Sequence, residues 1–224
     1  MPVWLFMFAV VAVLGLTGIV VRFLDSGELD PYHVLLCLFF SLNFLASYWE
    51  ICLYFRRDYV EQRVGFWRER QQEEQTSPAW LFLMQRVTLR RVFSPSFWAD
   101  VWASYSLYDG SYADRRTFGF TCDIANGFIT PLPSLILYAT FTTPFLPAIV
   151  AGAIGAMLFW QWLYVTSGYW ASFFIAKRHR ELGAWEAFAH VHLANSMWIL
   201  FPLLGLYVSI RLILDGNYSV LGVG

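Results

Sequence analysis

The sequence predicts an all-α integral membrane protein built as a bundle of five transmembrane helices, and three observations lead to this fold class. Hydrophobic residues make up 58% of the 224 residues, and the mean hydropathy of +0.51 is typical of a membrane protein rather than a soluble domain. Five apolar segments are each long enough to cross a bilayer as a helix, which takes about 20 residues. Most of the charged residues gather in two of the segments between them.

The first two predicted spans are residues 3–24 and 33–55. No charged residue precedes the first apolar run, and this run is too long for a signal peptide, so we expect a retained span. A short acidic link follows it. The second span carries one acidic residue, Glu50, close to its end.

A long polar segment, residues 56–117, follows the second span and contains both arginines and acidic residues. Its first part, residues 59–75, is typical of a charged helix that extends the second span, and Ser77 and Pro78 end this helix. Residues 79–93 have apolar side chains between arginines, which predicts an amphipathic helix on the membrane surface. A soluble helix packed on the loop would have the same pattern, so both placements stay open.

Three further spans are predicted at residues 118–140, 146–176 and 186–213. The fourth span is longer than the ~20 residues that a bilayer needs, so it tilts or projects. Lysine and arginine are concentrated in the segments after the second and fourth spans. The positive-inside rule therefore places these segments and the N-terminus in the cytoplasm, and the C-terminus outside. Arg22 and Arg211 would lie on the outer side, against the rule.

Four polar side chains lie at similar depths in three of the predicted spans: Glu50, Asp123, His192 and Asn195. Counting 1.5 Å per residue gives depths on the order of 8 to 14 Å from the cytoplasmic face, so all four share one layer. A carboxylate in hydrocarbon costs at least ~2.5–3.5 kcal/mol, so the two acids need a partner or a function. The arginines near the same face are candidate partners, namely Arg56, Arg57, Arg115 and Arg116.

In the fifth span, His192, Asn195 and Trp198 follow i, i+3, i+6 spacing and share one face of a helix. Asn195 offers hydrogen-bond donors and an acceptor, and the Trp198 ring attracts a cation. Asn195 would serve equally well to hold two helices together by an interhelical hydrogen bond. Other aromatic side chains, such as Trp49, offer further walls, although most are expected to anchor the protein at the membrane interface.

Two carboxyl groups in an apolar, aromatic-lined layer predict proton chemistry. A buried carboxyl group keeps its proton to a higher pH, so one can donate a proton near neutral pH while the other accepts one. A substrate that fits such a site is itself apolar, such as a sterol or isoprenoid entering from the bilayer. The sequence has no phosphate-binding loop, serine-hydrolase triad, zinc-protease motif or dinucleotide fingerprint. We therefore expect no metal and no other cofactor.

Charge and cysteine content exclude further classes. The formal net charge of -1 gives no argument for a nucleic-acid partner. The three cysteines lie in apolar surroundings without a CxxC pair, so neither a disulfide framework nor a zinc site is expected. Gly152 and Gly155 are a weak hint of helix dimerisation, which leaves a homodimer open.

Several motifs resemble the emopamil-binding protein family, which carries the EXPERA domain and includes sterol Δ8–Δ7 isomerases and the sigma-2 receptor. The family's W-x-x-Y-x-x-x-D-x-x-Y…F…E pattern is matched by Trp102, Tyr105, Asp109, Tyr112, Phe118 and Asp123. Its N-x-x-W…P motif is matched by Asn195, Trp198 and Pro202. Glu50 with Leu53 and Tyr54 is similar to the family's E-G-W-F-V-L-Y element, and Gln161 resembles a polar position of the fourth helix. The likeness covers about residues 33–213.

The resemblance implies a membrane protein that shifts a double bond in a sterol or polycyclic terpenoid by protonation and deprotonation. Glu50 and Asp123 would be the acid and base, with Asn195 as polar support and Trp198 as a cation–π wall. His192 is a candidate proton shuttle, because Ala46 stands where the family has a histidine. The remaining candidates for substrate binding are Tyr112, Gln161, Asn126 and Trp49.

The sequence departs from the family at three places, and other functions stay open. Besides Ala46, Asp123 is one methylene shorter than the family's glutamate, and residues 56–97 form an unusually long insertion. One alternative is a non-catalytic protein that binds sterols, lipids or cationic amphiphiles, and another is an accessory subunit that docks through its arginine-rich segment. We expect one membrane domain over residues 1–224, in the endoplasmic reticulum of a eukaryote or the inner membrane of a bacterium.

Overall fold

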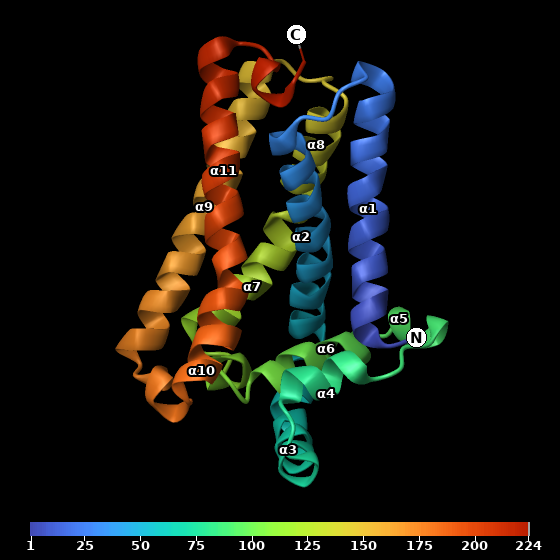
Figure 1. Cartoon of the computed structure of the whole chain (residues 1–224). Coiled ribbons are helices and arrows are strands. Elements are labelled where there is room, and N and C mark those ends of the chain that lie inside the picture. The colour runs from blue at the N-terminus through green and yellow to red at the C-terminus, as the bar shows by residue number, and fades with distance from the viewer. Residues whose placement is uncertain (224) are drawn as a thin grey trace. The chain divides into compact units, whose positions relative to one another are not determined.

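The structure, a computed structural model, describes residues 1–223 except for the side chain of Leu89. In this part of the chain every secondary-structure element is a helix, apart from one isolated β-bridge. Four helices are long and apolar enough to cross a membrane. They are α1 (Val3–Ser26), α2 (Pro31–Phe55), α9 (Ala148–Ile175) and the continuous run Ala184–Asp215 (Figure 1). The predicted all-α class is confirmed, and four to five such helices suggest a multi-pass membrane protein.

The predicted span at residues 118–140 is a pair of helices instead of one. α7 (Phe118–Ile129) and α8 (Pro131–Thr142) meet at Thr130 with a bend of 50°, and they count as a fifth span only if taken together. Pro131 explains the break, because it has no N–H to continue the hydrogen bonding of α7. At the first position of a new helix the missing N–H costs nothing.

The last span contains a change of helix type. Its run consists of α10 (Ala184–Glu186), the π-helix η3 (Ala187–Leu193) and α11 (Ala194–Asp215). His192 therefore lies in a π-helical turn, whereas Asn195 and Trp198 lie in α-helix. Because a π-helix has more residues per turn, the predicted i, i+3, i+6 stripe does not run through one regular α-helix.

The polar segment folds into four α-helices, α3 (Arg57–Glu74), α4 (Pro78–Met84), α5 (Leu89–Val92) and α6 (Pro95–Tyr105), and a short 3₁₀ helix. Ser77 and Ser94 cap α4 and α6, each followed by a proline at the first helical position. The prediction of one helix over residues 79–93 is wrong. The chain between α4 and α5 is extended, because its backbone bonds to the start of the chain: Val3 N–H donates to the Gln85 carbonyl at 2.9 Å.

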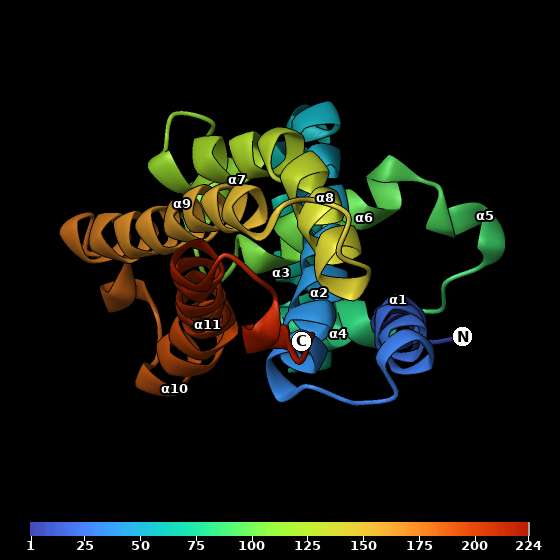
Figure 2. The same ribbon diagram turned by 90° about the horizontal axis from the view of Figure 1, so that it is seen from above.

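The chain divides into two compact units, each with its own hydrophobic core. The first unit comprises Met1–Ala9, Ala46–Phe128 and Tyr169–Ala194. In it, α3, α4 and α5 each pack on α6. Figure 2 shows α5 on the same side of α6 as the N-terminus. Asp100 on α6 is buried and accepts hydrogen bonds from Trp67 Nε1 at 2.9 Å and Arg63 Nε at 3.1 Å, which fastens α3 to α6.

The second unit comprises Val10–Leu45, Ile129–Gly168 and Asn195–Gly224. Its core is rich in aromatic side chains, such as Phe39, Phe40 and Trp162. The glycines considered for dimerisation serve packing inside this unit, since a Cβ on Gly152 would lie 2.6 Å from the Ser209 carbonyl of α11. The homodimer stays a prediction.

The two arginines that run against the positive-inside rule are held by local partners in the second unit. Arg22 is buried and donates to the carbonyl oxygen of Leu221 at 2.6 Å. Arg211 pairs with Asp215 at 2.8 Å, one turn further along α11. A guanidinium group bonded to a carbonyl or carboxylate is stabilised by this bond. The positions of Arg22 and Arg211 are therefore explained by their local partners, although they run against the positive-inside rule.

Candidate functional site

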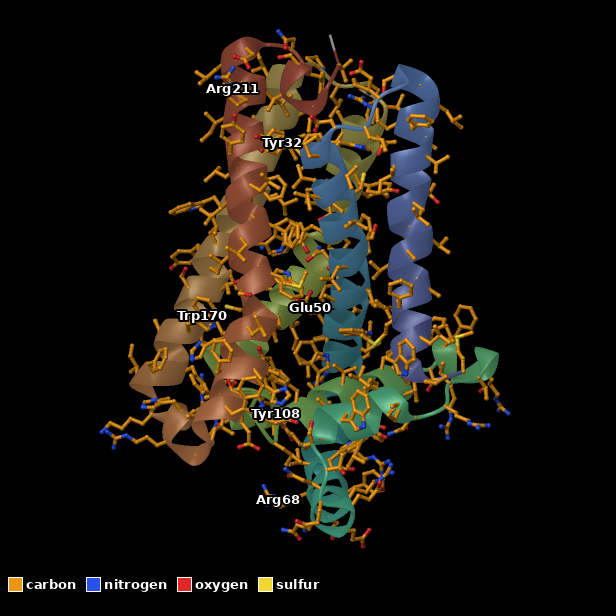
Figure 3. The ribbon with its side chains drawn as sticks, viewed as in Figure 1. Tyr32, Glu50, Arg68, Tyr108, Trp170 and Arg211 are labelled. Carbon is orange, nitrogen blue, oxygen red and sulfur yellow. The ribbon has the colours of Figure 1, made fainter. Side chains whose placement is uncertain are left out.

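Glu50 on α2 and Asp123 on α7 come together in the first unit. The Glu50 side chain is buried and lies on the side of α2 that faces α7 (Figure 3). The two carboxyl groups are close enough for a direct electrostatic interaction. The sequence predicts one depth for the two acids, and the fold adds that they are neighbours.

A glycine allows this approach of α2 and α7. A Cβ on Gly127 would lie 2.7 Å from the Glu50 Cβ and 2.9 Å from the backbone nitrogen of Ile51. Atoms other than hydrogen do not pack this closely, so only glycine fits at this crossing. Gly127 lies one turn after Asp123, and its missing side chain therefore brings the two acids together.

Tyr112 supplies the hydrogen-bond partner of Asp123. It lies in the short 3₁₀ helix η1 (Gly110–Ala113), is buried, and shares a side-chain hydrogen bond with Asp123. Burial, first of all, and then the nearby charge of Asp123 raise the pKa of the Tyr112 phenol well above its usual value. The hydroxyl group thus keeps its proton and donates a hydrogen bond to the Asp123 carboxylate.

Aromatic rings surround this tyrosine. The ring centroid of Trp102 lies 4.9 Å and that of Tyr105 lies 5.2 Å from the centroid of the Tyr112 ring. Such faces are electron-rich and favour a nearby positive charge. Because Tyr112, Trp102 and Tyr105 all come from the stretch before α7, one segment supplies both the aromatic wall and the helix that bears Asp123.

Three of the four arginines considered as partners of the two acids, Arg57, Arg115 and Arg116, are engaged elsewhere. Arg115 pairs with Asp58 at 2.6 Å and with Glu61 at 2.8 Å, and Arg116 pairs with Asp114. Arg57 donates to the Tyr54 carbonyl at 2.9 Å. Among the described residues, no ion pair neutralises Glu50 or Asp123. Two adjacent acids without a cation hold a proton between them rather than both ionise.

Asp109 forms a second buried polar group in the same unit, which sequence reasoning did not assign to the site. Its carboxylate accepts from Tyr169 Oη at 2.8 Å and from the Ser111 backbone N–H at 2.9 Å, and it pairs with Arg178 at 3.0 Å. Tyr105 also shares a hydrogen bond with Tyr169. Asp109 belongs to the motif that resembles the isomerase family, whereas nothing in the basic run around Arg178 distinguished it from its neighbours.

Trp49 and Asn126 lie beside the two acids in sequence and in the same unit. The carbonyl of Trp49 accepts from Trp102 Nε1 at 2.8 Å, and its ring stacks on Trp98 at 6.1 Å. The buried indole N–H of Trp49 has no hydrogen-bond partner in the described part of the chain. A buried unpaired donor is costly, so it is a natural point for a polar group of a ligand. Asn126 is buried on α7, one turn after Asp123.

The structure places His192 among aromatic rings. Its ring stacks on Phe174 at 5.4 Å and meets Trp170 edge-on at 5.7 Å, both from α9. These contacts are apolar, and the proton-shuttle role of His192 stays a prediction. Ala46, at the position of the family histidine, is buried on α2.

The other three predicted site residues belong to the second unit. Trp198 Nε1 donates to the side-chain oxygen of Asn43 at 3.2 Å, and its ring meets Phe39 edge-on at 6.4 Å. Asn195 begins this unit's part of α11, and Gln161 lies on α9. Their predicted contacts with a substrate stay predictions.

Comparison with known proteins adds no relative: neither protein-family models, nor curated proteins, nor solved structures gave a significant match to this chain. In residues 1–223, no group of three or more His, Cys, Asp or Glu side chains could hold a metal ion.

Proposed function

We propose that this chain is a multi-pass membrane protein that shifts a carbon–carbon double bond in a sterol or polycyclic terpenoid by protonation and deprotonation. The observation that carries the proposal is the pairing of Glu50 and Asp123, two acids from different helices that interact without a neutralising cation among the described residues. Sharing a proton gives one acid and one base in the same place, which is what a double-bond shift requires.

The proposed reaction needs no other reagent. One carboxylic acid of the pair transfers its proton to one carbon of the double bond, which leaves a carbocation at the other carbon. A carboxylate then removes a proton from the carbon next to the cation, and the electron pair of that C–H bond becomes the new double bond. The proton count of the enzyme is restored, and the rings of Trp102 and Tyr105 favour the cation between the two steps.

Three features support the assignment of roles. Tyr112 donates a hydrogen bond to Asp123, which favours Asp123 as the carboxylate and Glu50 as the protonated acid. The unpaired N–H of Trp49 offers a hydrogen bond to a hydroxyl or carbonyl group of the substrate. The resemblance to sterol Δ8–Δ7 isomerases, which rests on motifs of this sequence, points to the same chemistry.

The test is a sterol profile. The chain is expressed in yeast that lacks its own Δ8–Δ7 isomerase, and the Δ8 and Δ7 sterols are quantified by gas chromatography–mass spectrometry. We expect Δ7 sterols with the unchanged chain and their loss with Glu50→Gln and with Asp123→Asn. Glu73→Gln, which changes an exposed acid on α3, is the matched control and should keep the activity. An untouched Δ8 pool with a membrane-inserted chain would overturn the proposal for this substrate.

A second candidate function is the binding of cationic amphiphiles without catalysis. The same acid pair favours it, because a protonated amine would supply the missing positive charge. In this case a hydrophobic tertiary amine raises the melting temperature of the purified protein, and Glu50→Gln abolishes the shift, while no sterol is converted. Sterol conversion that an amine does not inhibit would exclude this candidate.

A further inference from the structure

We propose that α4 and α5 form a binding surface for the headgroups of anionic phospholipids, which we call the basic interface. It consists of three arginines and three exposed apolar side chains: Arg86, Arg90, Arg91, Trp80, Met84 and Phe93. The proposal rests on the membrane placement in the proposed function, but it is independent of the isomerase chemistry.

The basic interface lies at the edge of a membrane-spanning helix. α1 has 24 residues, so it is about 36 Å long, whereas the hydrocarbon core of a bilayer is about 30 Å thick. α1 is therefore long enough for its first turn to extend beyond the hydrocarbon, which places this turn at the interface with water in our proposal. The chain between α4 and α5 is bonded to this turn, with Val3 N–H donating to Gln85 and Val87 N–H donating to the Met1 carbonyl, both at 2.9 Å.

A contact between two aromatic rings also holds the first turns of α1 against α6. Phe6 of α1 packs on Trp98 of α6 with ring centroids 5.7 Å apart, and both α4 and α5 pack on α6. Just above this contact α1 presents exposed apolar side chains, such as Phe8. The two short helices are thus held beside the point where α1 leaves the hydrocarbon.

The apolar half of the basic interface is uncovered. Leu81 and Phe82 turn inward and are buried in the core of the first unit, whereas the exposed fractions of Trp80 and Phe93 are 51% and 80%. Met84 is 45% exposed. Exposed aromatic and large apolar side chains next to a span are typical of residues that insert among lipid headgroups.

The charged half has no acidic partner among the described residues, although the guanidinium group of Arg91 lies over the Phe97 ring at 5.7 Å from its centroid. Between Glu74 and Asp100 the sequence contains three arginines and no acidic residue. In the described part of the chain, none of these three arginines forms an ion pair. Five other arginines of the first unit do, among them Arg63 and Arg115. Guanidinium groups bind phosphate oxygens with paired hydrogen bonds, and an anionic bilayer surface attracts them further.

The experiment measures lipid selectivity by electron paramagnetic resonance. The full chain is reconstituted in phosphatidylcholine vesicles with a trace of spin-labelled phosphatidylglycerol or spin-labelled phosphatidylcholine, and the motionally restricted fraction gives their relative association constant. We expect a preference for phosphatidylglycerol of at least about threefold, since each arginine near an anionic surface contributes up to about fivefold. The triple variant Arg86→Gln/Arg90→Gln/Arg91→Gln should bring this ratio close to one.

Two further variants separate a local site from net charge and from misfolding. Arg68→Gln/Arg70→Gln/Arg116→Gln removes the same charge from other parts of the polar segment and should keep the preference. Replacing the three arginines of the basic interface by lysine keeps the charge and should also keep most of the preference for phosphatidylglycerol. Raising the salt concentration from 0.05 to 0.5 M should weaken the preference of the unchanged chain, because salt screens exposed charges.

Equal binding of the two lipids by the unchanged chain would overturn the proposal, and so would an equal loss of preference in the control triple variant. A chain that converts sterols but lacks the lipid preference would overturn the basic interface alone. A chain that stays out of the vesicles would overturn both this proposal and the membrane placement.

Discussion

The guanidinium group of Arg178 lies 3.0 Å from the carboxylate of Asp109, and this carboxylate is fully buried. The pair joins the segment after α6 to the end of α9 within the first unit. Asp109 is also bonded to Tyr169, whose hydroxyl group interacts with Tyr105. The pair therefore holds the polar end of the tyrosine cluster that reaches Tyr112 and, through it, Asp123.

Arg178→Gln should destabilise the protein strongly. Removing one partner of a buried ion pair leaves an uncompensated charge, which costs about 3–5 kcal/mol. The remaining hydrogen bonds of Asp109 to Tyr169 and Ser111 place the expected loss at the lower end of this range. Thermal unfolding of the purified protein in detergent measures the change. Arg180→Gln, an exposed neighbour, is the control, and an equal melting temperature of both variants would contradict the structural role of the pair.

Tyr112→Phe should lower the proposed isomerase activity while the protein stays folded. The change removes the hydroxyl group that donates to Asp123 but keeps the ring contacts to Trp102 and Tyr105. A positioned proton donor or acceptor contributes at least about 100-fold to a rate, and a residue that only orients it contributes less, so we expect a loss of about tenfold. The ratio of Δ7 to Δ8 sterols, normalised to protein level, measures it. Tyr164→Phe, on an exposed face of α9, should have no effect.

The same variant should change the stability at alkaline pH. A phenol in the unfolded chain loses its proton near pH 10, whereas burial raises the pKa of Tyr112 well above this in the folded protein. Above pH 10 the folded state thus holds one more proton than the unfolded state. The free energy of unfolding therefore falls by up to about 1.4 kcal/mol for each unit by which the pH rises. Below pH 10 this contribution is fully present. Melting curves from pH 8 to 11 should fall more steeply for the unchanged chain than for Tyr112→Phe, and parallel curves would refute the prediction.

Asp100→Asn should loosen α3 from α6. Oδ1 of the carboxylate accepts from both Trp67 Nε1 and Arg63 Nε. An amide oxygen carries no negative charge, so its hydrogen bonds to these donors are weaker and it does not balance the charge of the arginine. A lost hydrogen bond to a charged group costs about 1.5–3 kcal/mol. Limited proteolysis after the arginines of α3, together with the melting temperature, measures the effect. Asp58→Asn removes an acid whose side chain is 70% exposed, and it should leave both readouts unchanged.

The sequence predicts the long helices well but not their interruptions. α1, α2 and α9 begin and end within a few residues of the predicted spans, because each is an unbroken apolar run with polar residues at its ends. Pro131 marks a break that the hydropathy alone hides. The π-helix before α11 has no local sequence signal, and the extended chain at residues 85–88 depends on its pairing with the start of α1.

The candidate site is predictable in part for the same reason. Glu50 and Asp123 are conspicuous because acids are rare in apolar segments, and a simple count of residues places them at one depth. The partners of each side chain depend on contacts between distant segments. The bond of Tyr112 to Asp123 and the pairing of Arg178 with Asp109 both require the fold, because arginines closer in sequence to these acids pair elsewhere.

Gly127→Ala tests whether the close crossing of α2 and α7 sets the geometry of the acid pair. The new methyl group would overlap the Glu50 Cβ, so the helices must separate by several tenths of an ångström or more. Overpacking of this kind costs about 1–3 kcal/mol. Gly65→Ala on α3 is the matched control, since no atom lies within 4 Å of its added Cβ, and it should stabilise the helix by about 0.5–1 kcal/mol. Opposite shifts of the melting temperature, with activity lost only in Gly127→Ala, are expected. Activity at the normal level in Gly127→Ala would show that the proposed chemistry does not depend on the contact between these two helices.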